Sequence, residues 1–171
     1  MTLLDFETKF AKLGNNCKTK AVDRFNRELI KNHEDVSFLK NIILSKQQYH
    51  RTFFQVTLAQ CDSIRSKFDF IENNFDKLQA WWHVDQLSQF VDKDLTFDFA
   101  LEKAKKYIRS NLLFVRRWAY VMFMPSLVKQ NNIASKIFCL LKDDDQYYVQ
   151  MAEAWLISSL AVYESEITLG I

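Results

Sequence analysis

The sequence has little glycine, proline or cysteine, and no long hydrophobic run. Two glycines and one proline in 171 residues leave little material for the turns of hairpins and sandwiches, so an all-α chain with short connections is predicted. No apolar run approaches the roughly 20 residues that span a bilayer. Asp5 and Glu7 stand where a basic and then apolar leader would lie. We therefore expect no signal peptide, no membrane contact and a cytoplasmic location.

The cysteines and histidines do not form the patterns of a disulfide framework or a metal site. Cys17, Cys61 and Cys139 are odd in number and far apart, and no Cys-x-x-Cys occurs. We expect them to be buried thiols in a reducing cytoplasm. The three histidines are equally scattered, so no metal site is expected and no cofactor is implied.

Aromatic residues and helical periodicity dominate the chain. Fifteen Phe, four Trp and six Tyr supply a large apolar area for a core. The length suits one domain that folds without stabilising disulfides or metal ions. Apolar residues recur at spacings of three and four, which predicts ten helices, the first of them capped by Thr2. The predicted helices span about 3–13, 20–31, 36–43, 47–65, 68–78, 78–91, 97–108, 113–124, 133–141 and 149–160.

The later helices recur in pairs that begin near Ser66, Phe97 and Asn132. Paired amphipathic helices with a period of about 30 to 35 residues are typical of an α-solenoid of HEAT-like antiparallel pairs. The predicted fold is such a solenoid, a single domain over residues 1–171. One helix of each pair would line the concave surface, and the equivalent inner helices would then be 78–91, 113–124 and 149–160.

The first candidate site residues lie in LQAWWHVDQLSQFV. Trp81 and Asp85 are four residues apart, so on a helix they share one side within about 40° of each other, away from the apolar stripe. Arg116 and Arg117 open an otherwise apolar helix. An unpaired buried guanidinium is costly, so each arginine must reach a carboxylate, solvent or an external anion such as phosphate.

A second tryptophan, Trp155, lies roughly 100° off the core stripe of the last helix, beside Tyr148. On a solenoid's concave surface Trp81, Asp85, the arginine pair and Trp155 would converge. Aromatic faces, a carboxylate and guanidinium groups suit a cationic, electron-poor ligand attached to a phosphate backbone. Taken singly, each tryptophan also fits an ordinary aromatic that fills space between helices.

Positive charge is concentrated in one segment. Residues 97–117 carry 6 basic and 2 acidic side chains, net +4, whereas residues 118–171 carry 3 and 6, net −3. Lys103, Lys105, Lys106 and Arg109 are therefore candidate phosphate contacts, although a short basic run is also typical of a solvated helix face. Six charges are a modest footprint for duplex DNA.

Three segments in order, AWWHVDQL, FVRRWAYVM and YYVQMAEAW, resemble the signature segments of bacterial DNA alkylation repair proteins, the AlkD-like HEAT-repeat DNA glycosylases. The resemblance covers about residues 67–166. It implies a right-handed superhelix and a monomeric bacterial enzyme without a cofactor. The implied reaction hydrolyses the N-glycosidic bond of N3- or N7-alkylated purines in duplex DNA.

On that model Asp85 stabilises the oxocarbenium-like sugar and helps to position the attacking water. Trp81 and Trp155 contact the lesion nucleotide, and one residue of the Arg116-Arg117 pair contacts phosphate.

The chain also departs from the family pattern. Family members tend to carry a lysine before and an arginine after the last tryptophan, where this chain has Met151 and Ser158. The family's N-terminal segment with glycine and proline is not recognisable, and the chain ends at Ile171, so the last helices of the family are expected to be missing. The last segment resembles more closely a divergent branch.

Three hypotheses follow from the sequence. The first is an alkylpurine DNA glycosylase or lesion binder. The second is a non-catalytic paralogue that binds another DNA structure or a nucleotide-like ligand. The third is a protein-interaction solenoid in which the tryptophans are packing residues.

Overall fold

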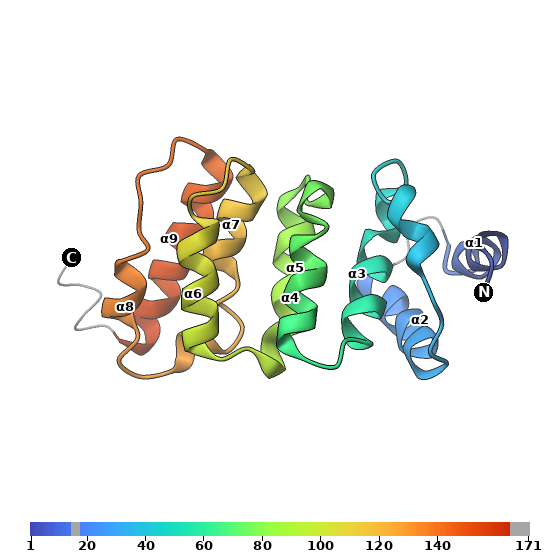
Figure 1. Cartoon of the computed structure of the whole chain (residues 1–171), viewed down its shortest axis with the longest axis horizontal. Helices are drawn as coiled ribbons and strands as arrows, with labels where there is room; N and C mark the ends of the chain where they lie inside the picture. The colour runs from blue at the N-terminus through green and yellow to red at the C-terminus, as the bar shows by residue number, and fades with distance from the viewer. Residues whose placement is uncertain (15–17, 165–171) are drawn as a thin grey trace. The chain divides into compact units, whose positions relative to one another are not determined.

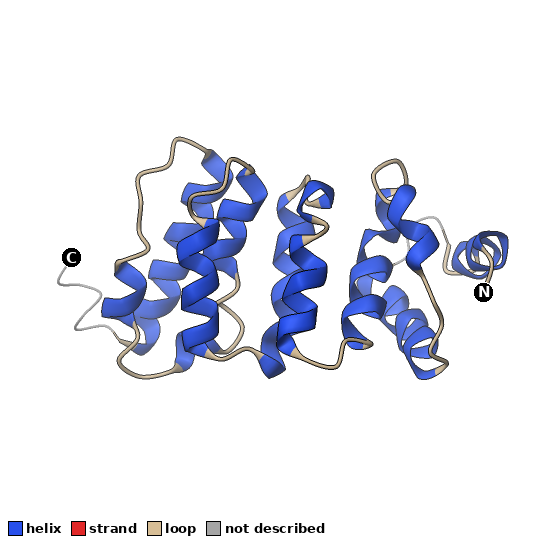
Figure 2. Cartoon of the chain, viewed as in Figure 1, coloured by secondary structure: helices blue, strands red, loops and turns tan. Residues whose placement is uncertain are grey.

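The computed structural model describes residues 1–14 and 18–164, which form helices, turns and loops (Figure 1). No strand occurs in these residues (Figure 2), so the predicted all-α class is confirmed. No helix in the described part of the chain is long and apolar enough to cross a membrane. The chain divides into two compact units, Met1–Ile71 and Glu72–Ile171.

The first unit has an aromatic core. Its elements are α1 (Leu3–Ala11), α2 (Thr19–Lys31), α3 (His50–Ala59) and α4 (Ile64–Glu72), with 3-10 turns at Ser37–Asn41 and Gln47–Tyr49. The last residue of α4, Glu72, belongs to the second unit. Thr2 caps α1 as predicted, because its hydroxyl accepts from the Asp5 amide at 3.2 Å while the Asp5 carboxylate accepts from the Thr2 amide. The rings of Phe6 and Phe10 both pack edge-on against Tyr49.

Two helices predicted in this unit differ from the structure. The segment 36–43 forms a 3-10 turn rather than an α-helix, and the predicted helix 47–65 is divided, since α3 ends at Ala59 and α4 begins at Ile64. Ser63 Oγ accepts from the Ser66 amide at 3.1 Å, and Ser66 Oγ donates to Asp62. Such local side-chain bonds compete with a continuous helix, and apolar periodicity cannot detect them.

The second unit is organised around one buried helix. Its α-helices are α5 (Trp81–Val91), α6 (Phe97–Tyr107), α7 (Leu113–Val121), α8 (Ala134–Phe138) and α9 (Tyr147–Tyr163). Helix α7 packs against α5, α6 and α9, and in Figure 1 α6 lies in front of α7 and α9. Trp118 and Tyr120 of α7 are among the largest fully buried side chains in the described residues. The position of α7 is therefore fixed on several sides.

The expectation of buried thiols is wrong for one cysteine and only partly right for another. Cys139 is exposed and Cys61 is half-buried, while Cys17 lies outside the described residues. Cys139 directly follows the short helix α8. The buried positions nearby are taken by Ile137, within α8, and by Leu140, just after it. Apolar periodicity predicts which residues of a helix are buried, but it gives no such information for a single cysteine beyond the end of a helix.

Two lysines of α6 bind the carboxylate of Glu72. Its carboxylate accepts hydrogen bonds from Lys103 Nζ at 2.6 Å, Tyr107 Oη at 2.6 Å and Lys106 Nζ at 3.1 Å. Burial by itself would raise the pKa of Glu72, but the three hydrogen bonds outweigh it and lower that pKa to about 2. Glu72 therefore stabilises the fold when it is ionised.

We expect Glu72→Gln to lower the free energy of unfolding by about 1–2 kcal/mol at pH 7, after allowing for solvent screening of a partly exposed group. The folded pKa lies below the ordinary value of 4.5, so this stabilisation is present above that value and is lost as pH falls toward 2. Urea unfolding at pH 7 and pH 3 should show the difference from wild type shrinking by more than half. Glu102→Gln, on the exposed side of α6, is the control. A pH-independent difference would contradict this account.

Candidate aromatic and acidic site

Trp81 and Asp85 lie on a side of α5 that the core does not use. Trp81 is the first residue of the helix and its side chain is 48 % exposed. Asp85 follows one turn later, with a side chain that is 20 % exposed. Val84, Leu87 and Val91 are buried on the packing side. The helix thus presents one aromatic ring and one carboxylate outside its apolar packing side.

The start of α5 is fixed by a buried histidine. His83 Nδ1 accepts from the Gln79 backbone amide at 3.1 Å, which closes the turn before the helix. Burial lowers the pKa of His83 to about 4, against a smaller opposing effect of the Lys77 backbone. The imidazole is therefore neutral at pH 7, and its bond to Gln79 lies at the turn that leads into α5.

Arg117 connects the three helices that carry the candidate residues. Its guanidinium, on α7, donates from Nε to Asp85 Oδ1 and from Nη2 to Asp85 Oδ2, both at 2.9 Å. Nη1 donates to the backbone oxygen of Tyr148, on α9, at 2.7 Å. The Arg117 side chain is only 3 % exposed, so this planar, bidentate pair satisfies a charge that would otherwise be costly to bury. One side chain therefore fixes α5 relative to α9.

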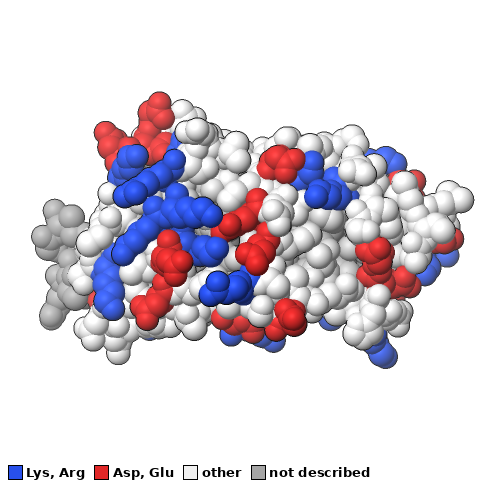
Figure 3. Space-filling model, in the orientation of Figure 1, with Lys and Arg blue, Asp and Glu red and all other residues white. Residues whose placement is uncertain are grey.

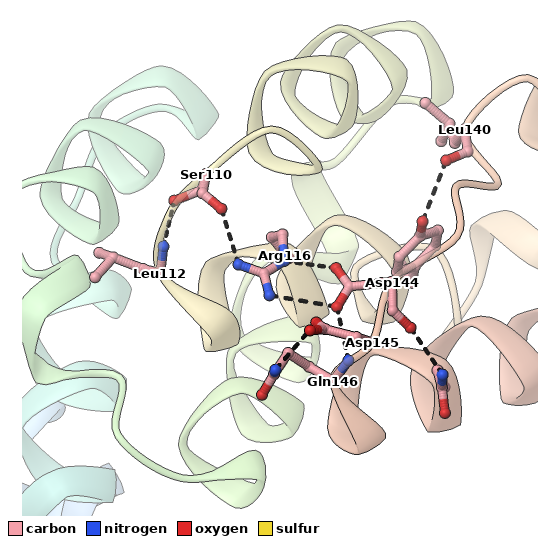
Figure 4. Close-up of polar contacts among 9 residues, drawn as sticks. Ser110, Leu112, Arg116, Leu140, Asp144, Asp145 and Gln146 are labelled. Carbon is pink, nitrogen blue, oxygen red and sulfur yellow. Dashed lines mark hydrogen bonds and ion pairs between the residues drawn. The ribbon is translucent and has the colours of Figure 1, made fainter.

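Arg116 belongs to a separate network (Figure 4). It donates to both carboxylate oxygens of Asp144, at 2.6 and 3.3 Å, and to the backbone oxygen of Ser110 at 3.0 Å. Asp144 also accepts from the Gln146 amide at 3.0 Å, directly before α9. Burial acts to raise the pKa of Asp144, but the bonds from Arg116 and Gln146 outweigh it and lower that pKa. Both arginines of the pair are thus engaged by carboxylates.

A polar hollow lies beside the pair of Arg116 and Asp144. Its volume is about 460 Å³, and its lining includes Arg109, Lys142 and the acidic run Asp143–Asp145. Charges of both signs therefore face the same space.

Helix α9 carries two apolar sides. Its predicted core stripe is buried, at Val149, Ala152, Leu156 and Leu160. The other side exposes Tyr148, Met151 and Trp155, which recur at spacings of three and four, with Trp155 48 % exposed. The Tyr148 ring centroid lies 5.8 Å from that of Phe114 on α7 and 5.4 Å from that of Tyr147. An aromatic surface thus extends along α9 from the residue whose backbone Arg117 binds.

The basic residues predicted as phosphate contacts lie elsewhere in this unit. Lys103 and Lys106 bind Glu72. Lys105 and Arg109 are exposed and form no ion pair within the described part of the chain. Within this unit, Lys and Arg atoms gather over α6 and are interrupted by Asp and Glu (Figure 3). These cations are carried by a different helix from the exposed tryptophans.

The structure brings together some of the predicted site residues and separates others. Asp85, Arg117 and the Tyr148 backbone are in direct contact, whereas Arg116 faces Asp144. Sequence reasoning did not identify Asp144 as the partner of Arg116. The acidic run before the last helix was the available signal, since a half-buried arginine needs a carboxylate. No cluster of His, Cys, Asp and Glu that could hold a metal occurs among the described residues.

The fold and this site define an all-helical protein whose buried arginine holds an aspartate among exposed aromatic rings. A family model for DNA alkylation repair enzymes matches residues 10–168, and the chain therefore belongs to the DNA alkylation repair enzyme family. The resemblance seen in three short segments is thus confirmed, and the family supports a role in DNA alkylation repair. Comparisons with curated proteins and with solved structures gave no match.

Proposed function

We propose that the chain is a DNA glycosylase that hydrolyses the N-glycosidic bond of N3- or N7-alkylated purines. The observation that carries the proposal is Asp85, which Arg117 holds at the surface of α5 one turn after an exposed tryptophan. An alkylated purine is already cationic, so the electron pair of the broken bond neutralises the leaving base. The protein then has to stabilise the positive sugar and admit a water.

Asp85 can perform both tasks while it is bound to Arg117. Each carboxylate oxygen accepts one bond from the guanidinium, which leaves further lone pairs for a water molecule. Water adds to the sugar carbon as the base departs and loses its proton to solvent or to the carboxylate. Trp81 and Trp155, both half-exposed, offer ring faces to the cationic nucleotide.

The overall architecture belongs to the same proposal. We infer a right-handed HEAT-like solenoid, folded as one monomeric domain, with α5, α7 and α9 as the inner helices. The period of the helix pairs in the sequence and the contacts of α7 with both α5 and α9 support it. The partner would be DNA with alkylated bases.

A non-catalytic DNA-binding paralogue is the second candidate function. Met151 and Ser158 stand where relatives tend to carry basic residues, and both are exposed. Fewer cations weaken the hold on duplex DNA. The exposure of Trp81 and Trp155 does not support the third hypothesis, in which both are packing residues.

Release of alkylated bases tests the enzyme proposal. We expect the wild-type chain to release 3-methyladenine or 7-methylguanine from alkylated duplex DNA in proportion to protein and time. The heat-denatured chain is the control, because these bases also depart spontaneously. Release no faster than the control would overturn the glycosylase proposal, and lesion binding without release would favour the paralogue.

A further inference from the structure

The inner helices of the site carry almost no available positive charge. Helices α5 and α9 contain no lysine or arginine, and α7 contains only Arg116 and Arg117. Both of these arginines bind carboxylates in bidentate fashion. A surface that grips duplex DNA neutralises several phosphates with free lysines and arginines. Phosphates placed against α5, α7 and α9 would meet none.

The polar hollow does not compensate for this lack. Its lining contains three cationic side chains, Arg109, Arg116 and Lys142, and three carboxylates, Asp143–Asp145. A phosphate entering the hollow would therefore meet balanced charge, and Arg116 would first have to leave Asp144.

Helices α5 and α9 carry exposed aromatic rings. They include those of Trp81, Tyr147, Tyr148 and Trp155, and Tyr163 is exposed at the end of α9. Arg117 fixes α5 relative to α9, so the rings are presented by helices of defined position. Stacking on such rings needs the flat face of a base, and a base in intact duplex has both faces covered by its neighbours.

We propose that the exposed rings of α5 and α9 bind an unpaired nucleobase by stacking, so that the chain prefers single-stranded or base-extruded DNA to intact duplex. The inference rests on the proposed function only in taking DNA as the ligand. Affinity then comes from ring contacts and depends weakly on salt. Recognition of a damaged strand follows from the exposure of the base rather than from a grip on the duplex backbone.

Fluorescence anisotropy with a labelled 12-nucleotide oligothymidine and a labelled blunt-ended duplex of 12 base pairs tests the inference. We expect the single strand to bind at least about fivefold more tightly than the duplex. Its affinity should fall by less than about tenfold between 50 and 200 mM salt, against the ~10³-fold or more of a protein with six to ten phosphate contacts. Tighter binding of the duplex, a steep salt dependence, or no binding to either probe would overturn the inference.

Variants of the same helices sharpen the test. We expect Trp155→Ala to weaken binding of the single strand about tenfold or more, and Trp155→Phe to retain most of it, because a ring face remains. The control is Val162→Ala, at an exposed position of α9 without a ring, which should leave binding unchanged. A loss with Val162→Ala equal to that with Trp155→Ala would contradict stacking.

The outcome is separable from that of the glycosylase proposal. Preference for the duplex together with release of alkylated bases would remove the stacking inference and keep the enzyme. Preference for the single strand without any release would keep the inference and remove the enzyme.

Discussion

Arg117→Met is expected to lower the free energy of unfolding by about 2–4 kcal/mol. Breaking a buried ion pair by removing one partner leaves the other charge uncompensated. In this chain the substitution would leave the Asp85 carboxylate and the Tyr148 carbonyl without their donors. Asp85 is 20 % exposed, so water can replace part of the interaction, which places the effect toward the lower end of the range for buried pairs. Chemical denaturation of wild type and variant measures it.

The neighbouring arginine provides a matched control. Arg116 pairs with Asp144 in the same bidentate way but is 17 % exposed, so Arg116→Met should cost only about 1–2 kcal/mol. The double variant Asp85→Leu with Arg117→Met removes both charges and should recover much of the loss. Equal costs for the two arginines, or no recovery in the double variant, would contradict the assigned role of Arg117.

Asp85→Asn is expected to reduce the rate of alkylpurine release by about 10²–10³-fold. The neutral amide keeps the size of the side chain but no longer opposes the positive charge that develops on the sugar, and losses of this order are typical when one electrostatic contact to a transition state is removed. Single-turnover release from alkylated duplex DNA measures the chemical step without product release.

Asp144→Asn separates this catalytic effect from a loss of folding. It weakens the adjacent arginine pair without touching Asp85, so it should change release less than about threefold, since no interaction with the sugar is altered. Thermal melts of both variants establish that the folded state persists at the assay temperature. Equal rates for wild type and Asp85→Asn would remove Asp85 from the mechanism.

Much of the fold could be predicted from local patterns. The scarcity of glycine and proline predicted the all-α class, the spacing of apolar residues predicted the core stripe of α9, and Thr2 predicted the start of α1. The same patterns also gave the separation of Trp81 and Asp85 from the packing side of α5. Helix ends were less predictable, because Asp62, Ser63 and Ser66 divide a segment that is apolar on both sides of the break.

The partners of the two arginines could not be predicted, because they lie far away in sequence. Arg117 meets a carboxylate 32 residues earlier and Arg116 one 28 residues later. Adjacent residues on a helix point about 100° apart. Arg116 and Arg117 therefore face different neighbouring segments. The requirement for a carboxylate, solvent or an anion followed from the cost of burying a guanidinium, but only the packing of α7 selects a carboxylate for each.

The most direct test of the account is a crystal structure of the chain bound to DNA that contains a single abasic-site analogue. We predict that the rings of Trp81 and Trp155 lie within about 4 Å of the nucleotides at the lesion and that Asp85 is the carboxylate nearest to the abasic sugar. DNA bound along the lysines of α6, with both tryptophans still facing solvent, would contradict it.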